Sequence, residues 1–495
     1  MTTPHVTIIG GGLTGLIAAY RLVTGPVPVR VMVAEESPRL GSEVRSITLG
    51  SVVMELGLDP QADLAGLIGP TGVSASSGSE ATASALIERL GIGHELIMEP
   101  ERRRHILLRG SLRPVPEGTI EGVPLHLRPV AESGLISPAG LARAGLDRVR
   151  PDDWPGTDES VGELVTRRLG REFATNLVEP LVGTPFATGI WDLSAGAATP
   201  ALAAAARRNR SLIAGLRATT QDKADTGRLQ GTLRRGLRSL VDRLVDSLSD
   251  QDLRTGTRVL AIEPVDGPGG AYEVILGDGS RVESDRIVIA LPAAGAARLV
   301  APRCPDAART LSSVGYAPTA TAVLALAPGS IPGVAPTPEG DRSDHPRSRE
   351  PMNGSLTSDI ALPFSDGRLS TRVGVRSATG PAEPTVVRIM AGHLGDDRCT
   401  QLDDDELVDV LAGELSTMFG FEGPIHEWHV NRRYEEFPLM APGHRSRLGR
   451  ILAEIRTNLP GVELASLAFE GTGLSAHIRR GTAAAEALAD QLPRP

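Results

Sequence analysis

The sequence predicts an α/β fold built around a Rossmann-like dinucleotide-binding domain. Residues 5–10 (HVTIIG) form a short apolar run rich in β-branched residues, which is typical of a buried parallel strand. The run leads into GGGLTG at 10–15 and then into LIAAYRLV, whose apolar spacing is helical. A second such run at 29–34 (VRVMVA) ends at Glu35. Strand, glycine motif, helix, strand and acid follow one another in the order of a dinucleotide site.

The three spaced glycines of this motif have separate roles. Gly10 permits the tight turn, Gly12 lets the backbone approach a pyrophosphate, and Gly15 lets the helix pack close to the strand. The other motif residues complete a helix amino end whose free N–H groups would hold the phosphates: Gly11, Leu13 and Thr14. Glu35 would accept both ribose hydroxyls and disfavour the extra phosphate of NADP. A glycine-rich turn with a solvated acid is the less favoured alternative.

Composition and charge exclude several classes of protein. The chain has 495 residues, which predicts two or three domains, and 41% of them are hydrophobic. A net charge of −9 without a basic block argues against a nucleic-acid partner. The sequence contains no run of 18 apolar residues, so no transmembrane segment is expected. The first strand begins within a few residues of Met1, so no signal peptide is expected either. Cys304 and Cys399 are predicted to be free thiols, so we expect a cytoplasmic protein.

The residues after Glu35 carry a family resemblance. The run EESPRLGSEVRS resembles the E-A-x-x-R-x-G-G-x-x-R-T run of the FAD-dependent amine oxidase and protoporphyrinogen oxidase superfamily, and the matching positions are Glu35, Arg39, Gly41 and Arg45. Ser42 and Ser46 depart from the pattern. The resemblance implies FAD as cofactor, with the two arginines near its pyrophosphate and flavin end. Glu55-Leu56-Gly57 is similar to the acid-x-Gly that related flavoproteins carry close to the cofactor.

Two further segments narrow the resemblance. Residues 160–194 (SVGELVTRRLGREFATNLVEPLVGTPFATGIWDLS) resemble protoporphyrinogen oxidases and the soluble coproporphyrinogen III oxidases of Gram-positive bacteria, and open with a capping box from Ser160 to Glu163. Residues 471–474 (GTGL) resemble the family's C-terminal G-x-G-[IL], which implies contacts of Gly471, Gly473 and Leu474 with the flavin and pyrophosphate. By the same resemblance, Val259 would lie on the adenine side of FAD.

We predict a discontinuous FAD-binding domain formed by 1–60, 225–300 and 445–495. Residues 61–224 would form a helical insert and part of the substrate domain, and 301–444 a mixed-sheet substrate-binding domain. Further elements are expected from apolar periodicity: strands at 47–57, 425–431 and 463–470, and helices at 80–90, 200–216 and 233–248. Low-complexity or proline-rich loops are expected at 69–84 and 328–353.

The resemblance implies an oxidase that passes hydride equivalents from a porphyrinogen to flavin N5. Dioxygen would reoxidise the flavin and release hydrogen peroxide, and coproporphyrinogen III is favoured over protoporphyrinogen IX. Non-covalent FAD is expected because no His or Cys lies in a recognisable flavin-linkage motif. No metal site is expected, since His426 and His429 would lie on opposite faces of their strand. No side chain is singled out as a catalytic base.

Two alternatives remain open at this point. The first keeps the fold but changes the substrate, giving an amine oxidase or desaturase of specialised metabolism. The low aromatic content of 3% favours it, as do four departures from the family pattern: Ser42, Thr188, Leu439 and Met440. It is weakened because the single lysine, Lys223, lacks the strand context of the lysine that many amine oxidases place at flavin N5. The second is a flavin-holding protein without turnover.

Overall fold

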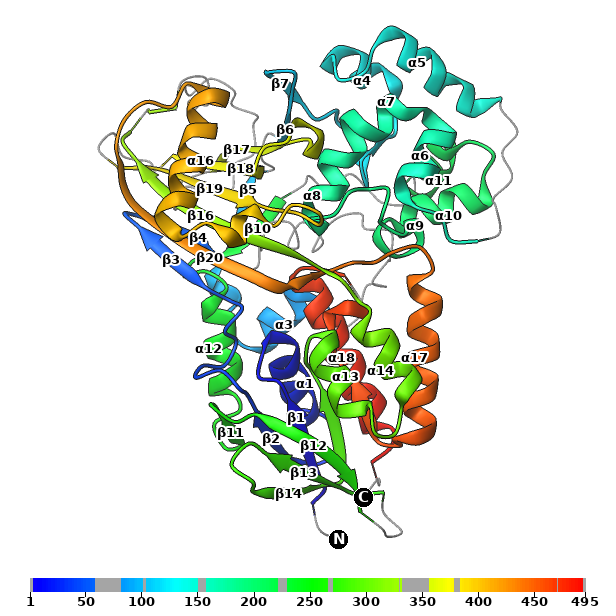
Figure 1. Ribbon diagram of the computed structural model, residues 1–495, viewed down its shortest axis with the longest axis vertical. Coiled ribbons are helices and arrows are strands. Elements are labelled where there is room, and N and C mark those ends of the chain that lie inside the picture. Colours follow the sequence, from blue (N-terminus) through cyan, green and yellow to red (C-terminus); the bar gives the residue numbers. More distant parts are fainter. Residues whose placement is uncertain are drawn as a thin grey trace.

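The computed structural model describes residues 3–57, 82–100, 104–149, 157–220, 229–265, 270–328, 330–331, 356–377, 383–469 and 471–492. Figure 1 shows a lower body of strands and helices that contains α1 and α18, an upper left body with a large sheet, and an upper right body of helices. The predicted α/β fold, with a Rossmann-like body, a mixed-sheet body and a helical insert, is confirmed. The residue boundaries of the three predicted domains stay a prediction.

A five-stranded parallel sheet forms the centre of the lower body. Its strands come from distant parts of the chain and lie in the order β11 (Asp252–Arg254), β2 (Arg30–Ala34), β1 (His5–Ile9), β15 (Arg286–Ile289) and β21 (Val462–Leu464). Ile8 is paired with Val33 on one side and Val288 on the other. All three side chains are buried, as expected for a parallel sheet covered on both faces.

Helices cover the two faces of this sheet, and the alternation of strand residues decides which. Ile8 packs with α1 (Leu13–Val23), α12 (Arg238–Asp246) and α18 (Leu474–Ala489). Ile9, one residue later, faces the opposite layer. That layer is formed by α13 (Ala293–Val300), α14 (Pro305–Ser312) and α17 (His444–Asn458). Both layers are visible around α1 and α13 in Figure 1.

A seven-stranded mixed sheet forms the second body. Its order is β20 (Ile425–Pro438), β16 (Tyr316–Leu326), β19 (Thr385–Ala391), β18 (Ser370–Ser377), β17 (Leu356–Ala361), β6 (Arg104–Leu108) and β7 (Ser111–Pro114). The pair β17–β6 is parallel and the other neighbours are antiparallel. Helix α16 (Asp404–Phe419) packs on one face, and the hairpin β3–β4 (Ser46–Leu49 and Val52–Glu55) contributes to the other.

Helices of the insert enclose a separate apolar core. The capping box is confirmed, because the Glu163 N–H donates to Ser160 Oγ at 3.1 Å and the Ser160 N–H donates to a Glu163 carboxylate oxygen at 3.1 Å. The insert contains α4 (Leu127–Ser133), α5 (Pro138–Gly145), α6 (Val161–Leu169), α7 (Arg171–Phe173), a π-helical segment (Ala174–Gly183), α8 (Thr184–Phe186), α9 (Ala195–Ala198), α10 (Pro200–Arg208) and α11 (Leu212–Thr220).

The remaining regular elements are short. The segments on either side of Asp278-Gly279 pair as a hairpin, which forms the last two strands of an antiparallel three-stranded sheet. The short elements are α3 (Ala83–Arg89), β5 (Leu96–Pro100), β8 (Thr119–Ile120), β9 (Val123–Pro124), β10 (Leu229–Leu233), β12 (Val259–Pro264), β13 (Tyr272–Leu276), β14 (Arg281–Ser284), α15 (Arg398–Gln401), and 3₁₀ turns at Gly93–Glu95, Leu146–Arg148, Phe364–Asp366 and Leu467–Phe469.

Several predicted elements were wrong in detail, three of them through nearby turns or strand ends. The strand expected at 47–57 is the hairpin β3–β4, which turns at Gly50 with φ +60°. The helix expected at 233–248 begins only at Arg238, because Leu233 ends β10 and Gly236 adopts φ +80°. Its apolar stripe is nevertheless buried against α1. The strand expected at 463–470 ends at Leu464 and is followed by a 3₁₀ turn.

The helix expected at 200–216 is broken into α10 and α11 by a buried ion pair. The Arg168 guanidinium donates to the carbonyl oxygens of Ala206 and Asn209 at 3.0 and 3.4 Å, so it satisfies the carboxyl end of α10. The Asp147 carboxylate accepts the Leu212 and Ile213 N–H groups at 3.1 and 3.2 Å and caps α11. Tertiary contacts therefore overrule the alanine-rich local sequence.

Candidate functional site

The glycine motif is closed against its neighbours by backbone contacts. Gly10 has φ +105° and its N–H donates to the Ala34 carbonyl at 2.8 Å. A Cβ at Gly10 would lie 2.4 Å from the Ala290 oxygen, and one at Gly15 would lie 1.9 Å from the Gly10 oxygen. Helix α1 therefore approaches β1 more closely than any side chain at Gly15 would allow.

Glu35 lies at the end of β2 against this motif. Its Oε2 accepts the Gly11 N–H at 2.6 Å and its Oε1 accepts the Ser37 N–H at 2.8 Å. The Glu35 carbonyl accepts the Thr257 N–H at 2.7 Å, which brings the start of β12 and Val259 to the same edge. The structure thus places together the two parts of the chain for which adenosine contacts were predicted.

The segment after Glu35 folds back onto the motif at Gly41. The Gly41 N–H donates to the Gly11 oxygen at 2.8 Å, and its φ of +58° is left-handed. A Cβ there would lie 2.5 Å from Val241 Cγ1 of α12. Arg39 and Arg45 are both exposed, and among the described residues no hydrogen bond joins either guanidinium group to the motif.

Sequence reasoning missed Glu43. Its Oε1 accepts the Leu13 N–H at the first turn of α1, and a Cβ at Gly12 would lie 2.8 Å from the same oxygen. Loss of hydration raises the pKa of the Glu43 carboxyl, and the negative charges of Glu436 and Glu35 act in the same direction. An acid two residues after Gly41, in a run that already contains Glu35, was the available signal.

Glu55, in the predicted acid-x-Gly, has a structural role. Its carboxylate accepts the Ser46 hydroxyl and the Leu237 N–H, the latter at 2.7 Å, so it fixes the start of α12. Gly57 passes close to the preceding loop, because a Cβ there would lie 2.1 Å from the Glu43 carbonyl oxygen. In this tripeptide the Gly57 backbone lies against the Glu43 loop, whereas the Glu55 carboxylate holds α12.

The end of β20 approaches Gly57 from the mixed sheet. Arg433 is 7% exposed, and it donates to Glu436 Oε1 at 2.6 Å, to Thr321 Oγ1 at 3.0 Å and to the Gly57 oxygen at 3.3 Å. Its guanidinium carbon lies 4.9 Å from the centre of the Phe437 ring. This buried cation joins the mixed sheet to Gly57, which in turn packs against the loop that carries Glu43.

The C-terminal glycines lie where all three bodies meet. Gly471 and Gly473 have φ of +95° and +96°, and Gly473 is the N-cap of α18, which begins at the buried Leu474. A Cβ at Gly471 would lie 3.6 Å from both Met440 Cε and Phe186 Cε1. Met440 follows β20 and Phe186 ends α8, so the predicted element lies between the mixed sheet and the insert.

Comparison with known proteins agrees with this geometry. Residues 13–489 match the family model described as flavin containing amine oxidoreductase. The chain belongs to this family. It is similar to the coproporphyrinogen III oxidase of Bacillus subtilis, with 26% identity and 97% of each chain covered. It is also similar to the coproporphyrinogen III oxidase of Mycobacterium tuberculosis, with 28% identity and 100% of each chain covered. A solved Exiguobacterium structure provisionally named protoporphyrinogen oxidase superposes with a TM-score of 0.78 at 24% identity, covering 99% and 100% of the two chains.

The chain is an FAD-dependent oxidoreductase of the flavin containing amine oxidoreductase family. Its residues fit the cofactor at the adenosine end, because α1 packs closely on β1 at Gly15 and Glu35 lies at the end of β2 beside Gly11. They also offer the amino end of α18. The amino end of α1 differs, since Glu43 already accepts its first N–H.

His477 is a second residue that sequence reasoning missed. It lies in the first turn of α18, is 3% exposed, and its Nδ1 is 2.7 Å from Thr14 Oγ1. This contact ties the C-terminal helix to the glycine motif. Burial lowers the pKa of His477 to about 4, so the ring is neutral at neutral pH.

Protonation of His477 is expected to destabilise the fold in acid. In the unfolded chain the ring titrates near pH 6.5, whereas in the folded chain its pKa is about 4. Between these values the unfolded state binds the proton first, so the free energy of unfolding should fall by up to about 1.4 kcal/mol per pH unit. Denaturant titrations of wild type and His477→Asn at neutral and acidic pH test this. The difference between the two proteins should shrink as pH falls, and a constant difference contradicts it.

Other predicted features have simpler outcomes. Among the described residues no group of His, Cys, Asp and Glu could hold a metal ion. His429 pairs with Glu427 at 3.0 Å. Cys304 and Cys399 are buried and unbridged, as predicted. In the described part of the chain no helix is long and apolar enough to cross a membrane. Lys223 and most of the two predicted loops lie outside the described residues.

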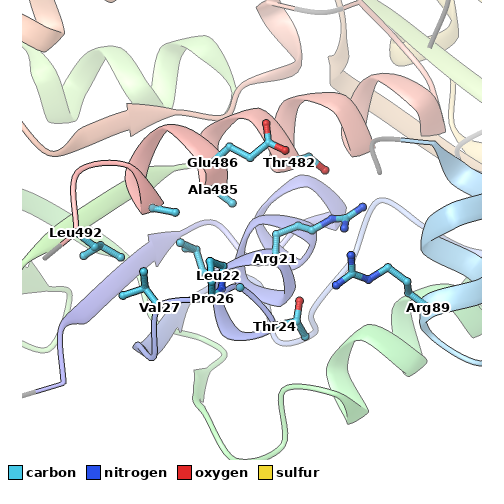
Figure 2. Close-up of a pocket in the computed structure, with 12 residues that line it drawn as sticks. Arg21, Leu22, Thr24, Pro26, Val27, Arg89, Thr482, Ala485, Glu486 and Leu492 are labelled. Carbon is cyan, nitrogen blue, oxygen red and sulfur yellow. The ribbon is translucent and has the colours of Figure 1, made fainter. Parts of the chain in front are cut away.

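A cavity of about 230 Å³ lies at the other end of α1. Figure 2 shows the guanidinium groups of Arg21 and Arg89 turned toward one another there, with Thr482 and Glu486 of α18 nearby. Thr24 caps this end of α1 and Gly12 the other, which separates the cavity from the glycine motif by the length of the helix, about 16 Å. The cavity is therefore not part of the candidate site at the glycine motif.

Proposed function

We propose that this chain is an FAD-dependent oxidase of a porphyrinogen, with coproporphyrinogen III favoured over protoporphyrinogen IX. The observation that carries the proposal is the similarity to proteins named coproporphyrinogen III oxidase, which extends over the whole chain and not over the cofactor site alone. Dioxygen is the final electron acceptor and hydrogen peroxide the product. The proposed cofactor contacts are those predicted from the sequence: Gly10, Gly11, Gly12, Leu13, Thr14, Gly15, Glu35, Arg39, Gly41, Arg45, Val259, Gly471, Gly473 and Leu474.

When bound, FAD supplies the acceptor for the substrate's hydride and passes the electrons to dioxygen. The task of the chain is positioning. The amino end of α18 offers N–H groups and the positive end of its dipole, which stabilise negative charge on a reduced cofactor. Met440 and Phe186 offer apolar surface at Gly471. Arg433 is occupied by Glu436 and Thr321, so it does not serve as a free partner for a substrate carboxylate.

We also propose that FAD is held non-covalently and that the protein works in the cytoplasm. The Cys399 thiol lies 3.8 Å from the Pro318 oxygen, and burial raises its pKa to about 11. Burial also raises the pKa of Cys304. Both thiols therefore stay protonated at neutral pH and are poor nucleophiles toward a flavin.

Anaerobic reduction of the bound flavin tests the substrate. Coproporphyrinogen III is expected to bleach the flavin absorbance within the time of one turnover, and admission of air should restore it with formation of hydrogen peroxide. Protoporphyrinogen IX should bleach it more slowly. Bleaching by a primary or cyclic amine but not by a porphyrinogen would instead support the amine oxidase alternative. A flavin reduced by dithionite alone would point to a protein without turnover.

A further inference from the structure

The amino end of α1 is occupied by a carboxyl group of the protein itself. Glu43 Oε1 accepts the Leu13 N–H, and the space above Gly12 is filled by the same carboxylate, 2.8 Å from the position of a Cβ. The diphosphate of a dinucleotide uses these N–H groups and this close approach. The Glu43 carboxylate and the FAD diphosphate would therefore occupy the same position at the amino end of α1.

We propose that Glu43 is an internal competitor of the FAD diphosphate, so that FAD binds together with one proton taken up by this carboxylate. Two negative groups cannot share one helix amino end without strong repulsion. The proton neutralises the carboxylate, and the diphosphate then accepts the Leu13 N–H in its place. The inference rests on FAD as the cofactor and is independent of which substrate is oxidised.

The charges around Glu43 favour this proton uptake. Glu35 at the end of β2 and Glu436 at the end of β20 both raise the pKa of Glu43, after the larger effect of lost hydration, while the Leu13 N–H opposes them. The cations of the surrounding elements are engaged elsewhere. Arg433 pairs with Glu436 at 2.6 Å, and Arg238 of α12 pairs with Asp242 at 2.8 Å.

Arg388 of β19 faces the neighbouring Gly57, and it donates to the Glu55 and Gly57 carbonyl oxygens at 2.8 and 3.2 Å. The two arginines nearest to Glu43 in the sequence do not neutralise it either. Arg39 and Arg45 belong to the same loop but are exposed, and within the described residues neither forms an ion pair with Glu43. A dianionic diphosphate added beside Glu43 would raise its pKa further. The bound state therefore holds the extra proton over a wider pH range than the free state.

The sign of the pH effect follows from this difference. Above the pKa of Glu43 in the free protein, FAD binding takes up a proton, so the apparent affinity falls as pH rises. The fall is at most about tenfold per pH unit and stops above the pKa of the bound state. Removing the charge at position 43 removes this dependence of FAD affinity on pH, and it strengthens FAD binding at neutral and alkaline pH.

Calorimetric titration of the flavin-free full chain with FAD tests the proposal. Wild type should show dissociation constants that rise with pH above the pKa of Glu43 in the free protein, by up to about tenfold per pH unit. At one fixed pH, the binding enthalpy should depend on the ionisation enthalpy of the buffer with a slope of up to one proton taken up. Glu43→Gln should bind FAD more tightly at the higher pH and lose both dependences. ADP, which carries a diphosphate without a flavin, should follow the same pattern.

Glu36→Gln is the matched control, because this acid lies in the same loop but is exposed and is 3.7 Å from Arg258. It should keep the pH dependence of wild type. The buffer test uses the unmodified protein, so it decides the matter even if Glu43→Gln does not fold. A wild-type binding enthalpy that is the same in all buffers would overturn the proposal, as would equal pH slopes in wild type and Glu43→Gln. Neither result would bear on the porphyrinogen.

Discussion

Gly15→Ala is expected to yield a protein that no longer retains FAD. The added Cβ would lie 1.9 Å from the Gly10 oxygen, which is backbone and cannot rotate away. Helix α1 would have to move off β1 and carry its amino end out of position. A strain of about 3 kcal/mol, typical of an overpacked site, corresponds to a loss of about 100-fold in FAD affinity. The flavin absorbance per purified chain and a direct FAD titration measure the loss.

Gly413→Ala and Gly449→Ala provide matched controls for this substitution. Both glycines lie in helices, in α16 and α17, and a Cβ at either position has nothing within 4 Å. Alanine there should leave FAD binding unchanged and stabilise its helix by up to about 1 kcal/mol. Full flavin occupancy in Gly15→Ala would contradict the close approach of α1 to β1.

Asp147→Ala is expected to destabilise the helical insert severely. The Asp147 carboxylate accepts the Ser211 hydroxyl at 2.7 Å and caps α11, and it faces the buried Arg168 guanidinium at 3.9 Å. Removing it takes the Asp147 charge away from that buried cation in the apolar core of the insert. The expected cost is about 3–5 kcal/mol, as for other buried pairs broken on one side. Hydrogen exchange of residues 157–220 measures it locally, which is preferable to one global transition in a chain of several bodies.

Glu132→Ala removes an exposed ion pair of the same insert and serves as the comparison. Glu132 pairs with Arg128 at 3.0 Å one helical turn away, and both side chains are largely exposed. The expected effect is within about 0.5 kcal/mol. If Asp147→Ala were as mild as this control, the Arg168 contacts would not explain why α10 and α11 are separate helices.

Local sequence was sufficient where an element depends on its own residues. The G-x-G-x-x-G motif and the following acid were recognisable because each position has a fixed steric or hydrogen-bonding role. The close contact at Gly15 agrees with its steric role, and Glu35 lies beside Gly11. The capping box at Ser160 likewise involves residues three apart in the chain. Apolar periodicity also identified the leucines that pack α12 against α1, even though the start of that helix was misplaced.

The predicted limits of an element were wrong where a residue distant in the sequence determines its end. The helix predicted over 200–216 is interrupted by Arg168 and Asp147, which lie more than thirty residues earlier in the sequence. The strand predicted at 425–431 continues to Pro438 because β16 offers partners as far as Tyr316. No local pattern contains this information, since both limits are set by pairing across the fold.

The sequence by itself determined the fold class, the cofactor and the family, because short motifs with strict geometry lie at the start of the chain and a different glycine motif lies near its end. Only the tertiary structure decided that Glu43 occupies the amino end of α1, that His477 is buried against Thr14, and that Phe186 and Met440 meet at Gly471. The physical reason is distance along the chain. Each of these contacts joins residues at least thirty positions apart, and folding alone brings them within reach of one another.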